Sequence, residues 1–285
     1  MGDNLSAVEL GANRTVVRLS VGNGHNCVVL DNNDIKCWGP GNAYRTGYED
    51  QQIRGNDGGL DMGENLLPLD LGESNSEYLT SVAGNFGHTC AIVNSSGEIA
   101  DTGDVKCWGE GGNGALGQGN TDDIGVLAGQ MGQNLSAVDL AGQSVIQVVI
   151  GISHSCALFE NGRVACWGEN SSGQLGLGVS GSRGAGPFEM GQDLMYVDLG
   201  GICSNTPNDG YNDGECLAIG EDWEPFIAKQ ISAFWNHTCA LSNHGFVKCW
   251  GENSKGELGL GDSNDRGLGQ SAMGDSLLPV YFDQN

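Results

Sequence analysis

The chain has 285 residues, 49 of them glycine, and carries 36 acidic against 12 basic side chains, a formal net charge of −24. A surface this acidic repels phosphate backbones and anionic lipids, which argues against nucleic-acid binding and membrane-surface binding. Six prolines without a Gly-X-Y period exclude collagen, and no stretch is long and apolar enough to span a bilayer.

One phrase recurs four times along the chain: His-x-Cys, a short hairpin, then Cys-Trp-Gly. The copies run from 25 to 39, 88 to 109, 154 to 168 and 237 to 251. Each is accompanied by four short apolar runs, one of which follows a Met-Gly dipeptide. Four such runs in about 60 residues are typical of a β-propeller blade. We therefore predict an all-β, β-propeller-type repeat protein of four four-stranded blades plus a fifth partial repeat. Either the four blades close alone, or the array is open, or the ring is completed by further chain or another copy.

The predicted strands follow these runs in chain order. They are 8–10, 16–21, 27–30 and 35–38 in the first repeat; 69–71, 78–82, 90–93 and 105–108 in the second; 138–140, 145–150, 156–159 and 164–167 in the third; and 197–199, 227–233, 239–241 and 247–250 in the fourth. A Gly-x-Leu-Gly turn follows at 114–117, 173–176 and 256–259, whereas the first repeat reads Pro40-Gly41-Asn42-Ala43 and is predicted to lack it.

The repeats are predicted to span 1–61, 62–130, 131–189 and 190–272, with an insertion at 200–222 in the fourth. Residues 273–285 repeat the Met-Gly phrase and are the start of a fifth repeat, or a closing or donated strand. Because the chain begins on a phrase that recurs inside it, we expect a processed piece of a longer secreted precursor.

Ten cysteines fall into five close pairs, which favours a disulfide framework and an oxidising compartment. The predicted pairs are Cys27-Cys37, Cys90-Cys107, Cys156-Cys166, Cys203-Cys216 and Cys239-Cys249, the fourth of which would staple the insertion. If Cys156 faces Cys166, a three-residue hairpin loop remains whose last residue, Gly162, suits a positive φ. Counting inward from the other cysteine pairs in the same way makes Gly245 and Asn33 the last loop residues of two other hairpins.

These phrases resemble the repeat of the regulator of chromosome condensation family, a β-propeller. Its motif runs Gly-x-x-His-Thr-x-Ala-Leu, then Gly-x-Val, then Trp-Gly-x-Asn-x-x-Gly-Gln-Leu-Gly. The matching stretches are Gly87-His88-Thr89-Cys90-Ala91-Ile92 in the second repeat, Ser153 to Leu158 and Trp167 to Gly176 in the third, and His237 to Leu241 with Trp250 to Asn253 in the fourth. The extra cysteine pair looks like the secreted branch of this repeat.

The resemblance implies a ring of about seven blades, whereas this chain has four complete units. Nuclear members of the family exchange nucleotide on a small GTPase and touch chromatin. An acidic, disulfide-bearing chain fits neither role, so those functional residues are not transferred.

The recurrent His and Trp residues could each have one of two roles. The four histidines, His25, His88, His154 and His237, could join the cysteines in a zinc site, but we expect structural hydrogen bonds because the cysteines pair off. The four tryptophans, Trp38, Trp108, Trp167 and Trp250, could form a sugar-binding surface, but recurrence in every unit favours packing. Trp223 and Trp235 lie outside that register and are the better sugar-binding candidates.

No cofactor is predicted, and calcium in the insertion is the alternative left open, with Asp209, Asp213 and Glu215 as oxygen ligands. The sequons at Asn4, Asn13, Asn94, Asn134 and Asn170 are glycosylation candidates. A sixth, at Asn236, adjoins the His-x-Cys strand and is expected to be less accessible.

No catalytic constellation stands out, so we predict a non-enzyme. The preferred function is a secreted, extracellular or cell-surface structural or interaction protein, a building block of a surface or filamentous assembly. Its partners would be other protein chains, copies of itself included, without nucleic acid and without a membrane span. The alternatives are a carbohydrate-binding propeller and a regulatory propeller that binds a protein partner.

Overall fold

The computed structural model describes residues 6–72, 78–84, 86–94, 102–203 and 223–280. Regular structure in these ranges consists of β-strands and short 3-10 turns without an α-helix, which confirms the predicted fold class. The strands are β1 (Val16–Val21), β2 (Asn26–Leu30), β3 (Ile35–Trp38), β4 (Tyr78–Gly84), β5 (His88–Asn94), β6 (Asp104–Gly109), β7 (Val145–Ile150), β8 (His154–Phe159), β9 (Val164–Gly168), β10 (Gly201–Cys203), β11 (Trp223–Pro225), β12 (Ala228–Phe234), β13 (His237–Ser242) and β14 (Val247–Gly251). The 3-10 turns are η2 (Asn42–Tyr44), η3 (Gly63–Asn65), η4 (Gly112–Gly114), η5 (Gly132–Asn134), η6 (Gly191–Asp193), η7 (Gln270–Ala272) and η8 (Gly274–Ser276).

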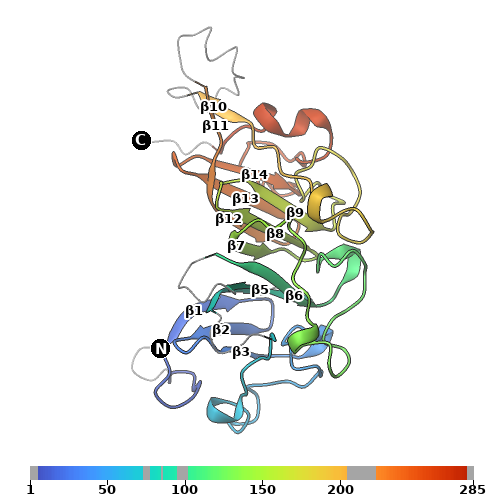
Figure 1. The fold of residues 1–285 in the computed structure, drawn as a ribbon. Coiled ribbons are helices and arrows are strands. Elements are labelled where there is room, and N and C mark those ends of the chain that lie inside the picture. The colour runs from blue at the N-terminus through green and yellow to red at the C-terminus, as the bar shows by residue number, and fades with distance from the viewer. Residues whose placement is uncertain (1–5, 73–77, 85, 95–101, 204–222, 281–285) are drawn as a thin grey trace. The chain divides into compact units, whose positions relative to one another are not determined.

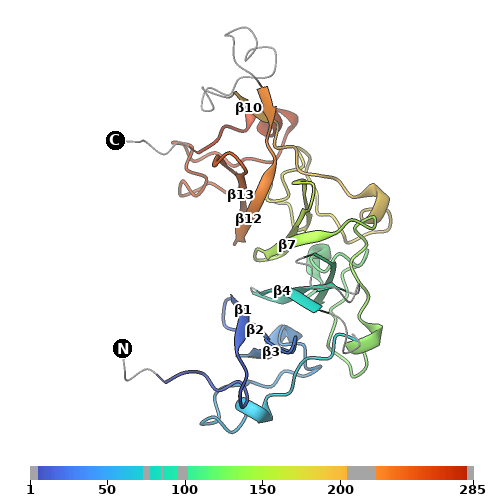
Figure 2. The same cartoon turned by 60° about the vertical axis from the view of Figure 1, so that its left-hand side comes forward.

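Each repeat contributes one three-stranded antiparallel sheet, in the orders β1-β2-β3, β4-β5-β6, β7-β8-β9 and β12-β13-β14. The chain divides into two compact units, residues 1–110 with 123–137 (unit 1) and residues 111–122 with 138–285 (unit 2). In unit 1, β4 lies against β1 and β2; in unit 2, β12 lies against β7 and β8 (Figures 1 and 2). The pair β10-β11 joins the two ends of the insertion, with Cys203 opposite Trp223.

The cysteines set the hairpin register as the sequence predicts. Cys27 lies opposite Cys37, Cys90 opposite Cys107, Cys156 opposite Cys166 and Cys239 opposite Cys249, and each of these pairs is disulfide-bonded with a Cα–Cα distance of 4.1 Å. The loop residues Asn33, Gly162 and Gly245 have φ of 68°, 77° and 91°. Of the fifth predicted pair, Cys216 lies outside the described residues.

The predicted strands at 8–10, 69–71, 138–140 and 197–199 are not strands in the structure, and each of these sheets has three strands. The Met-Gly phrase that follows each sheet in sequence is instead joined to its last strand by single backbone contacts. The Leu69 amide donates to the Ile35 carbonyl (2.8 Å), and the Val197 amide donates to the Val164 carbonyl (2.8 Å). Ala137 forms the corresponding bridge to Lys106. The Val280 amide donates to the Val247 carbonyl of β14 in the same way (2.7 Å), so residue 280 of the fifth phrase lies at the edge of the fourth sheet.

A buried lysine ties two Met-Gly phrases to the fourth sheet. The Lys248 ammonium donates to the Leu199 (2.8 Å) and Gly201 (3.2 Å) carbonyls on one side and to the Gly274 carbonyl of the last phrase (3.5 Å) on the other. Its burial lowers the pKa to about 8 against the opposing effect of Asp275 and Asp198. Lys36 and Lys106 donate to phrase carbonyls in the same way, and the third repeat has Ala165 at that position. The lysine therefore strengthens a join that the backbone already makes.

We expect removal of one cross-strand disulfide to weaken the fold without changing its register. Because the Cys156–Cys166 bond closes a loop of ten residues, replacing both with alanine should lower the free energy of unfolding by about 3 kcal/mol. Urea denaturation followed by circular dichroism measures the change. The exposed Ser171→Ala variant is the control and should stay within about 0.5 kcal/mol of the parent; an equally small change in the double variant would contradict the prediction.

Candidate functional site

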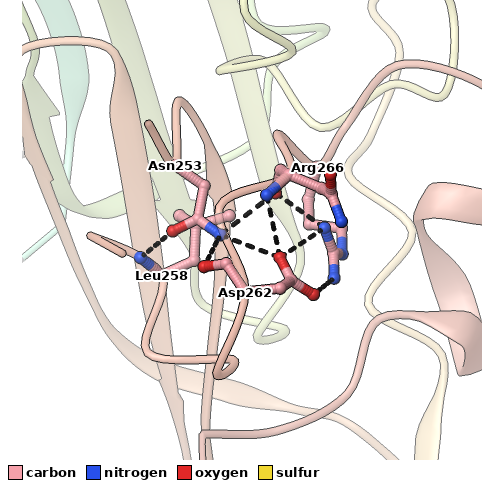
Figure 3. A network of polar contacts seen from close by, with 5 residues as sticks. Asn253, Leu258, Asp262 and Arg266 are labelled. Carbon is pink, nitrogen blue, oxygen red and sulfur yellow. Dashed lines mark hydrogen bonds and ion pairs between the residues drawn. The ribbon is translucent and has the colours of Figure 1, made fainter. Parts of the chain in front are cut away.

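A tight turn follows Cys-Trp-Gly in each repeat and presents one backbone carbonyl to its surroundings. In the fourth repeat Asn253 organises it: its Oδ1 accepts from the Leu258 amide (2.9 Å), and its Nδ2 donates to the Asp262 carbonyl (3.0 Å) (Figure 3). Asp262 in turn holds Arg266 through an ion pair of 2.7 Å. Asn170 plays the same part in the third repeat, accepting from Leu175 at 3.1 Å. The turn is therefore fixed by its own side chains.

The first repeat has this turn too, which corrects the prediction that it lacks one. It is formed by Tyr44-Arg45-Thr46-Gly47, closed by a bond from the Gly47 amide to the Tyr44 carbonyl (3.0 Å), as Gly117 bonds to Gly114 in the second repeat (2.9 Å). Ala43 and Tyr44 have φ of 59° and 57°, a left-handed conformation that costs free energy for residues with a Cβ. The sequence pattern predicts the turn only where glycine occupies the left-handed positions. In the first repeat Ala43 and Tyr44 adopt that conformation instead, so the pattern misses this turn.

The turn carbonyl of one repeat accepts two buried hydrogen bonds from the next repeat. Trp108 Nε1 donates to the Arg45 carbonyl (3.1 Å), and Thr89 Oγ1 donates to the same oxygen (2.7 Å). The equivalent donors are Trp167 with Ser155 onto Ala115, at 3.0 Å each, and Trp250 with Thr238 onto Gln174, at 2.9 and 3.3 Å. All three tryptophans are fully buried.

The motif histidine completes the contact from the other side. His25 Nε2 lies 2.8 Å from Thr89 Oγ1, and His154 Nε2 lies 2.9 Å from Thr238 Oγ1. Since the Thr89 proton goes to Arg45, the imidazole is the donor, and its ring is neutral. Burial, reinforced by the Arg45 charge, lowers the pKa of His25 to about 4. We call the set of His, Thr or Ser, Trp and turn carbonyl the junction.

Backbone contacts between the linker of one repeat and the turn of the preceding one flank the junction. Gly178 exchanges two hydrogen bonds with the fourth-repeat linker, to the Gly267 carbonyl (3.0 Å) and from the Gly269 amide (3.1 Å). The linkers are held by two-way bridges from the Gly of Cys-Trp-Gly to Arg54, Ile124, Arg183 and Arg266. The Arg-Gly dipeptides at 54–55, 183–184 and 266–267 are the sequence signal that would have revealed this repeated bridge.

The outer face of the first sheet carries half of a junction. Val21, Asn26 and Trp38 stand opposite one another across its three strands. Trp38 and Asn26 are partly exposed, and neither side chain has a hydrogen bond within the described residues. On the same face Leu19 is 63% exposed, whereas the equivalent Ile231 in the fourth repeat is 1% exposed.

The outer face of the fourth sheet carries the other half. Along β13 the burial alternates, with His237, Cys239 and Leu241 partly exposed, whereas all of β8 is buried. A Cβ added to Gly256 would meet nothing within 4 Å, whereas one added to Gly173 would lie 2.4 Å from the Arg266 carbonyl. Glu257 stands where Gln174 stands, and no donor reaches its carbonyl among the described residues.

The zinc reading of the histidines is wrong where the structure describes it, because the cysteines beside them are disulfide-bonded and cannot act as thiolate ligands. In the described ranges no three His, Cys, Asp or Glu side chains gather as a metal site would require. The calcium candidates Asp209, Asp213 and Glu215 lie outside those ranges.

The sugar-binding reading of the repeat tryptophans fails for Trp108, Trp167 and Trp250, which are buried donors. Trp223 is partly buried, while Trp235 is 47% exposed and meets Phe234 edge to face. Among the sequons, Asn13 and Asn134 are exposed. Asn94 and Asn170 are buried, which corrects their choice as glycan acceptors because a folded chain leaves no space for a sugar there. Asn4 is not described.

A hollow of about 200 Å³ in unit 2 lies between the third hairpin loop and the segments that precede and follow the insertion. Arg163, Asp198 and Phe226 are among its lining residues, and its lining includes no serine, cysteine or histidine that could act as a nucleophile or base. No helix in the described ranges has the length and apolar character needed to cross a bilayer.

Comparison with known proteins identifies the repeat. The family model for the regulator of chromosome condensation (RCC1) repeat matches residues 16–44, 145–174 and 228–257. The ultraviolet-B receptor UVR8 of Arabidopsis thaliana is 27% identical over 267 residues, which are 93% of this chain and 48% of the receptor. The probable E3 ubiquitin-protein ligase HERC4 of Homo sapiens is 33% identical over 122 residues, 43% of this chain and 9% of the ligase.

The crystal structure of human WBSCR16 superposes with a TM-score of 0.60 at 16% identity, covering 91% of this chain and 55% of that one, which supports the fold alone. The chain spans about half the length of UVR8 and a small part of HERC4. In its motifs and in three matched repeats this chain is similar to RCC1-type repeat proteins, and its fold is similar to that of human WBSCR16.

Proposed function

We propose that this chain is a non-catalytic, protein-binding building block of an extracellular or cell-surface assembly. The observation that carries the proposal is the junction: the recurrent His, Thr or Ser and Trp side chains are buried and hydrogen-bonded between repeats. The motif histidines and tryptophans thus contribute to the packing between repeats, which supports a structural role for them. Function then falls to the outer surfaces, as is usual for repeat arrays that present extended binding faces.

The disulfides support the extracellular part of the proposal. Each of the four three-stranded sheets holds one cross-strand disulfide, and the described residues contain no free cysteine. Such frameworks persist in oxidising compartments and are rare where glutathione keeps thiols reduced. The net charge of −24 favours protein partners over nucleic acid.

Native material tests this proposal directly. Differential alkylation of the protein taken from its source should find the four described cysteine pairs protected without reductant, and cross-linking followed by size separation should find the chain bound to protein. Recovery of a free single chain with alkylatable thiols would contradict the proposal, whereas free thiols on a protein-bound chain would overturn the compartment alone.

The structural role of the histidines has a pH signature. Below pH 6.5 the unfolded chain binds a proton at His25 that the folded chain does not bind until about pH 4. The folded state therefore loses up to about 3 kcal/mol from this residue as pH falls from 6.5 to 4. His25→Gln should reduce the slope of unfolding free energy against pH in that window.

The control for this prediction is Ser171→Ala, an exposed position that carries no titratable group. It should leave the slope as in the parent. An unchanged slope in His25→Gln, or stabilisation of the parent by added zinc, would show that the histidine does not serve the junction.

A carbohydrate-binding role is the second candidate, and one observation favours it: Phe234 and Trp235 form an exposed aromatic pair with ring centroids 6.4 Å apart. Aromatic faces of this kind stack on sugar rings. A glycan array would support the role if binding appears and is lost in Trp235→Ala, and an array without binding would remove it.

A further inference from the structure

We propose that copies of this chain associate head to tail, the outer face of the fourth repeat docking on the outer face of the first repeat of a second copy. The inference rests on the proposed function and names the partner for these two faces. The first-to-second and the third-to-fourth repeat steps form the same full contact, and the two outer faces carry its two complementary halves. A second copy brings to each face the half that it lacks.

The polar groups match in number and in role. Inside the chain a turn carbonyl accepts from a Trp indole and a Thr or Ser hydroxyl, and that Thr accepts from a His. The fourth repeat offers the acceptor, the Glu257 carbonyl, together with the His237 imidazole. The first repeat offers the Trp38 indole and the Asn26 amide, and an asparagine supplies both an NH₂ donor and an oxygen acceptor. Asn26 can therefore do at the docked face what Thr89 does inside the chain.

The backbone halves also match. Gly178 exchanges hydrogen bonds with Gly267 and Gly269 of the following linker. Its counterpart on the fourth repeat, Gly261, is exposed, with nothing within 4 Å of a Cβ placed on it. The counterpart linker in the first repeat begins at Gly55, which is exposed, whereas Gly125, Gly184 and Gly267 are buried at that position.

Docking would also bury apolar side chains on both outer faces that are exposed to solvent in the single chain. Leu19 and Val21 are 63% and 71% exposed on the first repeat, whereas Val148 and Ile150 at those positions of the third repeat are nearly fully buried. Leu241 and Val247 are partly exposed on the fourth repeat, whereas the equivalent Leu158 and Val164 are fully buried. Burial of these side chains supplies the driving force, and Asn253 holds the turn in shape before docking.

Like charge opposes this association. A chain of net charge −24 repels its copies at long range, and salt screens that repulsion. We therefore expect association to strengthen as ionic strength rises, the reverse of an interaction that depends on opposite charges.

Sedimentation velocity of the 285-residue chain at about 1 to 100 µM tests the proposal, because this range covers the affinities of weak protein contacts. The expected result is a concentration-dependent series of dimers and longer species, favoured by salt. A single monomeric species at every concentration and salt would overturn it, whether the faces are covered by some other chain in the native material or meet within one chain.

Two charge variants establish which faces meet. Leu19→Glu places a charge on the first face, and Ser232→Glu places one beside Cys239 on the last face; both positions are exposed, so the fold should tolerate them. Each variant alone should be monomeric, because each has one intact face. An equimolar mixture should form dimers and nothing longer. If Ser232→Glu still associates alone, the contact joins like faces and the head-to-tail proposal is wrong.

Trp38→Phe tests the hydrogen bond itself, since it keeps the ring and removes the donor. Loss of one buried hydrogen bond should weaken association about tenfold. Trp223→Phe makes the same change at a tryptophan outside the junction register, whose Nε1 has no hydrogen-bond partner among the described residues, and should leave association as in the parent. Equal effects from both variants would contradict the assigned contact. Self-association can fail while native cross-links to other proteins persist, which would overturn this inference and leave the proposed function standing.

Discussion

The structure depends on one backbone oxygen in each of the first three repeats, the carbonyl that the turn after Cys-Trp-Gly presents to the following repeat. A carbonyl buried without a partner costs free energy comparable to a lost hydrogen bond, and here two donors from the next repeat satisfy it. The indole can reach that oxygen only if the turn holds its shape, which is why Asn170 and Asn253 have both ends of their amides occupied. The disulfides act within a sheet and the junction acts between sheets, so the two devices stabilise different levels of the fold.

The junction also explains why the chain uses histidine where a donor is needed. A buried imidazole with a lowered pKa stays neutral near pH 7 and donates one hydrogen bond without bringing a charge into the core. A lysine at this position would have to be desolvated as an ion. Lys248 shows the alternative, a buried ammonium that is surrounded by backbone carbonyls and still has its pKa lowered.

Local geometry could be predicted from the sequence because cysteine spacing and loop residues encode it. The opposed cysteines and the positive φ at Asn33, Gly162 and Gly245 follow from counting alone. Contacts between repeats could not be predicted, because they involve backbone carbonyls that carry no residue signature. The turn at Tyr44 was missed for the same reason: tertiary packing holds a tyrosine in a conformation that sequence rules reserve for glycine.

The outer faces of the first and fourth repeats keep the apolar residues of an internal contact, unlike the polar outer face of a capping repeat. Terminal repeats that face water normally replace apolar contact positions with polar ones. Here Leu19, Val21 and Trp38 remain apolar on the first face, and His237 and Leu241 keep their junction identities on the last. On a face that only contacts water, any polar residue would serve at position 26. A side chain that both donates and accepts, such as Asn26, is favoured where two partners must be satisfied at once. Its placement in one row with Trp38 and Val21 keeps the donor side of the internal junction available, so the first face has the chemistry of a contact and not that of a cap.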